Sequence, residues 1–318
     1  TDGSGNLTFT SNSTLPSLAT GKIYVGSSGT PIVSSVIHVS ESKNSLIVGE
    51  NNYIDHVGQS NKSNSAIIGG IGNYIRTPFS EDSIMVGGAC NTIYNSSDAF
   101  IGSGRCNCIN TSNNSVILGG SENTASVGGA NSILGGYRNK IQTNHGFIGN
   151  GICNTIAGSS NAYNAIVSGE NNAITSSFSS TLRHNFIGGG KDNTISGSCS
   201  GILGGHDNII NHNDSFIIGS NLSATDSCTT YMNNLQVEGD TLFGTNNNDI
   251  HQVTGSVHIT GPLEVTGSLN VDGSLVVDGP ISSTVFVNSY SSDSAAGAAG
   301  VPVYGLYRNG SFLIVRLS

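Results

Sequence analysis

The sequence predicts an all-β fold: an elongated homotrimer with parallel β-roll or β-solenoid repeats, a triple β-helix shaft and a C-terminal β-hairpin tip. Two repeats and one turn signal lead to this prediction. A phrase of 15 to 21 residues recurs through the first part of the chain, a hexad repeat follows it, and Asn309-Gly310 lies between two alternating segments near the end. Only 10% of the residues are charged and Trp is absent, so a helix-rich enzyme is not expected.

Five segments are expected along the chain. Residues 1–40 contain short alternating strands separated by Gly and Ser, and form an N-terminal β attachment segment. Residues 41–222 carry the long repeat, and residues 223–254 form a neck in which that repeat is lost. The hexads occupy residues 255–281, and residues 282–318 form the C-terminal tip, with Ser291 to Gly300 as a loop or a tightly packed axial strand.

The long repeat reads as a small polar residue, two or three apolar residues, Gly, two variable residues, Asn, one variable residue and Ile. The apolar run predicts a short strand, and the Gly-x-x-Asn step predicts a turn because Gly and Asn tolerate left-handed backbone. The Ile then points inward from a second short strand. In stacked coils the asparagines are expected to form a ladder. They are Asn52, Asn73, Asn91, Asn107, Asn123, Asn139, Asn154, Asn172, Asn193 and Asn208.

A coil of this length holds two or three short strands and one apolar stripe, which is thin for a core. A single chain would leave an apolar side in water, so several copies are expected to pack their stripes on a common axis. The alternative is a one-chain, three-sided β-helix, for which the 21-residue coils are long enough.

The hexads GSVHIT, GPLEVT, GSLNVD and GSLVVD begin at Gly255 and place two apolar residues on the same side of an extended chain. Six residues cannot enclose a core, whereas three chains wound together would bury both apolar positions. The hexads are therefore the strongest argument for a homotrimer. Their inward residues are Val257, Ile259, Leu263, Val265, Leu269, Val271, Leu275 and Val277, while His258 and Glu264 point outward.

Coil length varies after the repeat's Ile, with extra residues at 55–64, 76–82, 157–164 and 175–184. Loops on a rigid scaffold often carry binding residues. The alternative role for all of the candidates is a solvated loop position or packing between chains. The receptor-contact candidates are Tyr163, Phe178, Arg183 and His184 in the loops, and Tyr290, Tyr304, Tyr307 and Arg308 in the tip.

No catalytic residue, metal site or cofactor is predicted. Glycoside cleavage usually needs two carboxylates flanking a groove, but acidic residues are sparse and recur at turn positions. His206, Asp207, His212 and Asp214 also occupy turn positions, so we interpret them as solvated rather than as metal ligands. The six cysteines lack the C-x-x-C spacing of a zinc or redox site and are expected to be free thiols of a reducing compartment.

The net charge of -9, with 11 basic residues scattered singly, gives no electrostatic footprint for nucleic acid. No apolar run approaches the ~18 residues of a membrane span, so membrane insertion is not expected. Because the chain begins at Thr, it is expected to be a trimmed piece of a longer chain.

The N-S-x-I-I-G-G phrases between residues 44 and 222 resemble the head repeats of trimeric autotransporter adhesins, which build a trimeric left-handed parallel β-roll. The hexads resemble the triple β-helical shafts of viral and phage fibres, and both ends of the chain look like segments of phage tail-fibre proteins. The sequence departs from the adhesins in its longer, uneven coils and in lacking the heptad stalk and membrane anchor.

These resemblances imply a non-enzymatic, trimeric fibre of a virion that combines structural reach with host attachment. It would be assembled in the host cytoplasm and displayed on the virion surface. Its expected partners are a host cell-surface glycan or protein and other tail or capsid proteins of the virion. The alternatives are a trimeric tailspike that cleaves polysaccharide and a cellular trimeric adhesin on the extracellular surface.

Overall fold

The computed structural model describes residues 22–25, 32–40, 44–55, 64–76, 82–158, 163–175, 184–238, 252–266, 269–274, 276, 278, 289–301, 306–309 and 312–315. The chain divides into two compact units, Thr1–Asp240 and Thr241–Ser318. The boundaries of the five predicted segments stay predictions.

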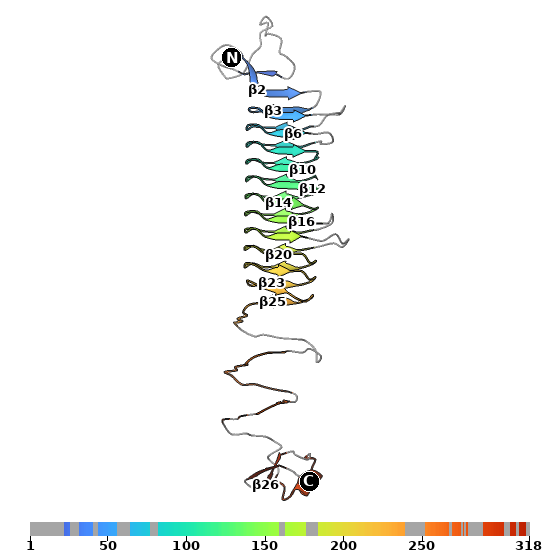
Figure 1. Ribbon diagram of the computed structural model, residues 1–318, viewed down its shortest axis with the longest axis vertical. Coiled ribbons are helices and arrows are strands. Elements are labelled where there is room, and N and C mark those ends of the chain that lie inside the picture. Colours follow the sequence, from blue (N-terminus) through green and yellow to red (C-terminus); the bar gives the residue numbers. More distant parts are fainter. Residues whose placement is uncertain are drawn as a thin grey trace, which may run out of the picture. The chain divides into compact units, whose positions relative to one another are not determined.

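The first unit is a parallel β-solenoid of about 10 turns, seen in Figure 1 as a stack of short arrows. Its described strands form a 14-stranded first sheet and an 11-stranded second sheet. The first sheet consists of β1 (Lys22–Val25), β2 (Ile32–Ser40), β3 (Ser45–Val48), β5 (Ala66–Ile67), β7 (Ile84–Met85), β9 (Phe100–Ile101), β11 (Val116–Ile117), β13 (Ser132–Ile133), β15 (Phe147–Ile148), β17 (Ala165–Ile166), β19 (Phe186–Ile187), β21 (Gly201–Ile202), β23 (Phe216–Ile218) and β25 (Thr230–Met232). The second sheet consists of β4 (Tyr53–Asp55), β6 (Tyr74–Arg76), β8 (Thr92–Tyr94), β10 (Cys108–Asn113), β12 (Thr124–Gly129), β14 (Lys140–Gln142), β16 (Thr155–Ala157), β18 (Ala173–Thr175), β20 (Thr194–Ile195), β22 (Ile209–Ile210) and β24 (Ser223–Ala224).

Each coil contributes one strand to each sheet, in the order that the repeat predicts. In the coil that begins with β15, Ile148 pairs with Ile133 and Ile166 of the neighbouring coils. Ile156 of β16 pairs with Ile141 and Ile174 in the same way. Like residues therefore stack above like, and the parallel β-solenoid predicted from the repeat is confirmed.

The core is formed by two columns of isoleucines, one from each sheet, that lie inside a single chain. Ile148 and Ile156 are both fully buried, and the equivalent residues of most coils are as well. The expectation of a single apolar stripe as the core of each coil is therefore wrong, whereas the packing of several copies on a common axis stays a prediction. Each coil supplies two inward side chains because the centre of each short strand faces the interior.

The turn chemistry differs from the expectation in one residue. In the coil of β7, the left-handed backbone falls on Gly88 and on Cys90, immediately before the repeat's Asn91. Asn91 itself is fully buried and has no left-handed backbone. The residue before the Asn takes the strained conformation, while the Asn side chain points inward and bonds to neighbouring coils.

The outer faces of the two sheets differ in polarity. The outward residues of the first sheet from β3 to β23, which we name the apolar face, include a single polar side chain, Ser132. On the second sheet the outward residues, the polar face, are mostly Thr, Ser, Asn, Tyr and charged residues. The apolar face consists of Leu46, Val48, Ala66, Ile68, Ile84, Val86, Phe100, Gly102, Val116, Leu118, Ser132, Leu134, Phe147, Gly149, Ala165, Val167, Phe186, Gly188, Gly201, Leu203, Phe216 and Ile218.

The N-terminal end of the first sheet is covered by antiparallel strands instead of another coil. β2 pairs antiparallel with β3, and β1 pairs antiparallel with β2. Both strands lie in residues 1–40, where short alternating strands were predicted. An antiparallel cover protects the edge of a solenoid from pairing with other chains.

The second unit contains a short helix, α1 (Asp293–Ala298), and an antiparallel pair, β26 (Leu306–Asn309) and β27 (Phe312–Val315). The helix replaces the loop or axial strand expected at residues 291–300. Its first turn is capped by the Ser292 hydroxyl, which accepts from Ala295 N at 3.2 Å, and Ala296 packs with Val301 and Tyr290. Whether the β26–β27 pair forms the tip of a fibre stays a prediction.

Within the described part of residues 252–278 the hexads form no strand, and their apolar side chains are exposed. The triple β-helix therefore stays a prediction. No helix in the described part of the chain is long and apolar enough to cross a membrane.

Candidate functional site

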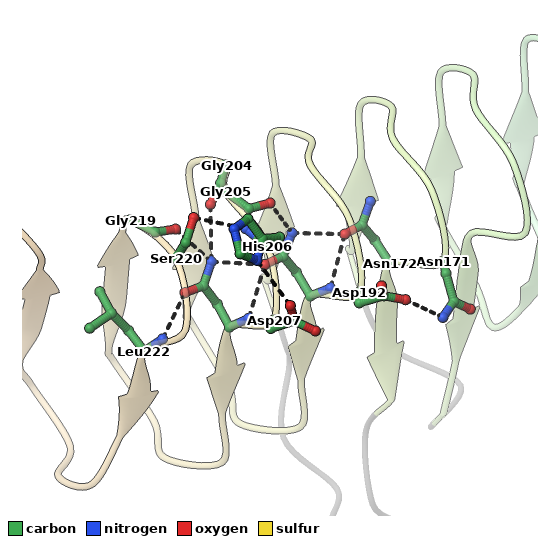
Figure 2. A network of polar contacts seen from close by, with 12 residues as sticks. Asn171, Asn172, Asp192, Gly204, Gly205, His206, Asp207, Gly219, Ser220 and Leu222 are labelled. Atoms are coloured by element: carbon green, nitrogen blue, oxygen red, sulfur yellow. Dashed lines mark hydrogen bonds and ion pairs between the residues drawn. The ribbon is translucent and has the colours of Figure 1, made fainter.

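The repeat's asparagines form a continuous hydrogen-bonded column along one corner of the solenoid (Figure 2). The Asn193 amide N–H donates to Asn172 Oδ1 at 3.1 Å, and its Nδ2 donates to the same oxygen at 2.9 Å. Nδ2 also donates to the Gly205 carbonyl of the next coil at 3.0 Å. Each side chain thus joins three coils, and its oxygen accepts from the buried backbone N–H of the next asparagine.

The column ends where the repeat loses its asparagine. Asn208 Oδ1 accepts from the backbone N–H of Leu222 at 3.1 Å (Figure 2). Leu222 has no side-chain amide, so the column does not continue beyond it. Beyond this coil, β25 still pairs with β23, and Asn233 Oδ1 accepts from the backbone N–H of Ser220 at 2.7 Å.

A second polar column lies at the opposite corner, just before each strand of the first sheet. Ser200 N donates to Asn185 Oδ1 at 3.0 Å, and Asn185 N donates to Asn164 Oδ1 at 3.1 Å. The sequence showed a small polar residue at the start of each phrase, but no role was assigned to it. These residues are Ser45, Ser65, Ser83, Ser115, Asn131, Asn164, Asn185, Ser200 and Ser215, all buried.

Three exposed aromatic rings stack outside this second corner, and we name them the aromatic stack. Tyr163 lies between His145 and His184, with ring centroids 4.4 Å apart at 21° and 5.4 Å apart at 6° respectively. Each ring belongs to the residue just before the buried corner position. Successive coils therefore hold the rings at a fixed spacing and present them to solvent as one rigid surface.

The aromatic stack brings together two of the four loop candidates, Tyr163 and His184. It adds His145, which the sequence reasoning missed because that coil carries no insertion. A usable signal was present: the same repeat position holds His, Tyr and His in three successive coils. Phe178 and Arg183 lie outside the described residues.

The candidates in the second unit have different surroundings. Tyr290 is half-buried against the Ala296–Val301 cluster, and its backbone N–H donates to the carbonyl of Arg308 at 2.9 Å. Arg308 is exposed on β26. Tyr307 also lies on β26, but its side chain, like the whole of Tyr304, is outside the described part. Tyr290 therefore has a packing role, and Arg308 is accessible.

The turns at the Asn corner carry ion pairs on neighbouring coils. Lys191 Nζ lies 3.1 Å from Glu170 Oε1, and Arg138 Nε lies 2.6 Å from Glu122 Oε2. The glutamate partners raise the pKa of Lys191 and of Arg138 above their ordinary values. All four side chains are about half exposed, so such pairs contribute little to stability.

The histidine and aspartate residues of the same corner form a local contact and no larger cluster. His206 Nδ1 lies 2.9 Å from Asp207 Oδ2, and both side chains are exposed (Figure 2). Within the described ranges, no group of three or more His, Cys, Asp or Glu residues is arranged to hold a metal ion.

All six cysteines are described, and none is in a disulfide. Cys90, Cys106 and Cys153 occupy the left-handed turn position before the repeat's Asn. Cys108 lies on the polar face of the second sheet, where burial raises the pKa of its thiol. The reducing compartment inferred from the sequence stays a prediction.

The hexad residues form no enclosed core in a single chain. Val257, Leu263 and Leu269 are exposed to 65%, 65% and 63%, and Ile259, Val265 and Val271 are also exposed. Leu275 and Val277 lie outside the described residues. The alternating apolar side chains are thus available for contact with other chains.

The fold and the two polar columns define the chain as a parallel β-solenoid protein. Neither a scan against protein-family models nor a search of curated proteins gives a match.

Proposed function

We propose that the protein is a non-enzymatic, homotrimeric fibre that attaches a virion to its host cell. The observation that carries this proposal is the apolar face, which runs along the first sheet and carries no charged side chain. Soluble monomers rarely expose large contiguous apolar patches. A face of this kind on successive coils favours burial against further copies of the chain.

Glycines lie beside two of the aromatic residues of the apolar face. Phe147 and Phe186 are each followed, two residues on, by a glycine on the same face. A methyl group added at Gly149 would clash with the carbonyl oxygen of Val167, and one added at Gly188 would clash with that of Leu203. These two positions therefore have no room for a side chain beside the ring, and sheets without such projections can pack face to face at about 10 Å.

The larger aliphatic side chains of the apolar face remain solvent-exposed in one chain. Leu118 is 47% exposed and Leu203 is 53% exposed, although their inward neighbours Ile117 and Ile202 are fully buried. Three copies that meet on this face would cover these side chains and leave the second sheet outward. The polar face and the aromatic stack would then be accessible for attachment.

The hexads support the same number of chains. Their apolar residues lie exposed in a single chain, and an extended hexad repeat gains a core only when several chains are wound together. The proposed fibre therefore has two trimerisation regions. The proposed partners are a host cell-surface molecule and other tail or capsid proteins of the virion.

Light scattering tests the assembly. A native mass near three times the 32.5 kDa of the chain is expected. Leu118→Asp with Leu134→Asp on the apolar face should weaken the trimer, whereas Asn110→Asp on the polar face of the same region should not. A native mass near 32.5 kDa for the unmodified chain would overturn the proposal.

A second measurement tests attachment without catalysis. The labelled protein should bind host cells, and incubation with host-surface polysaccharide should release no new reducing ends. Release of oligosaccharide would show a cleaving tailspike instead.

A further inference from the structure

The polar face carries a compact aromatic and charged cluster at its N-terminal end, on strands β4, β6 and β8. The strands pair in register, with Tyr53 opposite Tyr74, Asp55 opposite Arg76, and Arg76 opposite Tyr94. These five side chains form two adjacent columns. One consists of Tyr53 and Tyr74, and the other consists of Asp55, Arg76 and Tyr94. No residue of this cluster was singled out from the sequence.

The cluster differs from the rest of the polar face. After Tyr94 the described outward residues of the second sheet are Cys, Asn, Thr, Ser, Val, Lys, Gln, Ala and Ile, and none is aromatic. Tyr53 is 57% exposed and Tyr94 is 37% exposed. Tyr and Arg are the residues most enriched where proteins make energetically important contacts.

The tyrosines offer a ring face for stacking. The rings of Tyr53 and Tyr74 are parallel within 5°, with centroids 5.7 Å apart. β4 is the terminal strand of the second sheet among the described residues, so no described strand of that sheet covers the other side of Tyr53. The stacking holds the Tyr53 ring in a fixed orientation.

The polar groups of Tyr74, Asp55 and Arg76 near the Tyr53 ring position one another. The Tyr74 hydroxyl donates to Asp55 Oδ2 at 3.2 Å, and burial together with this carboxylate raises the pKa of Tyr74. Arg76 Nε lies 3.7 Å from the same oxygen, which is too long for a hydrogen bond.

The guanidinium of Arg76 is positioned from its other side by an aromatic ring. It lies 5.5 Å from the ring centroid of Tyr94, in cation–π contact. Arg76 Nε is itself buried and has no hydrogen-bond partner among the described residues, whereas the side chain as a whole is 43% exposed. The Arg76 guanidinium therefore lies next to the Asp55 carboxylate, in the column beside the exposed ring of Tyr53.

We propose that Tyr53, Asp55, Tyr74, Arg76 and Tyr94 form a binding site for a neutral saccharide with a hexopyranose ring. The apolar C–H face of the sugar stacks on Tyr53, Asp55 accepts from one hydroxyl and Arg76 donates to its neighbour. A neutral ligand fits because the carboxylate and the guanidinium offset each other, and a charged sugar would leave one of them opposed. The inference rests on the proposed attachment function, since it names the class of surface molecule that is bound.

The full chain is tested on an array of immobilised neutral oligosaccharides with terminal hexoses, together with sialylated and sulfated ones. Binding to a neutral oligosaccharide is expected, and its affinity is then measured by titration. Tyr53→Ala should weaken it about tenfold, because it removes the stacking ring, whereas Tyr53→Phe should retain it within about twofold. Asp55→Asn should also weaken it.

Tyr137→Ala provides a matched control. Tyr137 also lies against an arginine, Arg138, at 4.7 Å from ring centroid to guanidinium, but at the Asn corner of the solenoid. The control should keep full affinity. Circular dichroism and light scattering of each variant show whether the fold and the assembly are intact.

Several results would overturn the inference: no neutral oligosaccharide bound at millimolar concentration, binding of acidic oligosaccharides alone, or equal affinity in Tyr53→Ala and the unmodified chain. Cell attachment that survives periodate oxidation of the surface glycans would indicate a protein partner and would also contradict it. A trimer that attaches to cells without binding neutral saccharides would leave the proposed function intact. A monomer that binds them would instead contradict the proposed assembly.

Discussion

Asn154 donates twice to one oxygen of Asn139 in the preceding coil. Its backbone N–H and its Nδ2 each lie 3.0 Å from Asn139 Oδ1. Asn139 Nδ2 in turn donates to the carbonyls of Gly135 and Gly151 at 3.0 and 2.9 Å. One buried amide therefore satisfies backbone groups of its own coil and of the next, at a corner where the strands have ended.

Asn139→Ala is predicted to lower the free energy of unfolding by about 2–4 kcal/mol, because it removes the partner of the buried Asn154 N–H and the side-chain bonds to the Gly135 and Gly151 carbonyls. Urea unfolding monitored by circular dichroism measures the change. Asn110→Ala, at an exposed position of β10, should change the same quantity by less than about 0.5 kcal/mol. Equal effects of the two substitutions would contradict the structural role of the column.

Gly88 and Gly87 provide a matched pair for the turn. Gly88 has a φ of +89°, and a methyl group added there would clash with the carbonyl oxygen of Gly104 in the next coil, whereas one added at Gly87 would meet nothing within 4 Å. Gly88→Ala is predicted to destabilise the solenoid by at least about 2 kcal/mol. Gly87→Ala should cost less than about 1 kcal/mol. Thermal melting of both variants measures the difference. A melting temperature lower for Gly87→Ala than for Gly88→Ala would refute this view of the turn.

The coil repeat was readable from the sequence because Gly, Asn and Ile recur at fixed positions. Which apolar residues point inward was not readable. In the Ala66-Ile67-Ile68 run the centre and both neighbours are apolar, so no alternation separates the buried Ile67 from the exposed Ile68. The two isoleucine columns and the apolar face were therefore merged into one stripe. At residues 293–298 the Ser, Ala and Gly composition gave no apolar spacing, so α1 was missed.

The candidate site was predictable only in part, because coil length marks only those coils that carry an insertion. Tyr163 and His184 precede a corner next to an insertion and were named, whereas His145 occupies the same corner in a coil without one. Tyr53 and Tyr74 fill the variable position between the repeat's Asn and Ile, where most coils have a small residue. Their stacking depends on the register between coils, which the spacing of 21 residues in the sequence hides.

Cys108 is predicted to react more slowly with iodoacetamide than Cys106. The thiolate is the reactive form, and burial raises the pKa of Cys108, so its thiolate fraction near pH 8 is reduced. Its reactivity should increase as the pH rises toward that elevated pKa. Cys106 is exposed at a turn. Mass spectrometry of timed samples gives both rates, which should become similar in urea. A faster reaction at Cys108 in the folded protein would contradict the burial argument.

Val271→Asp tests the hexads separately from the apolar face. Val271 is 42% exposed in one chain and is predicted to face the axis of three wound chains. Three carboxylates would then converge in a site without water or counter-charge, which is strongly unfavourable. Light scattering should therefore show loss of the trimer, while circular dichroism retains the signal of the β-solenoid.

His258→Asp is the control for this substitution, because His258 is predicted to point outward from the same segment. It should assemble like the unmodified chain, since its added charge stays in water. A normal yield of trimer from Val271→Asp would mean that the hexads do not wind around a shared axis. Assembly would then depend on the apolar face alone, and Leu118→Asp with Leu134→Asp would have to abolish it completely.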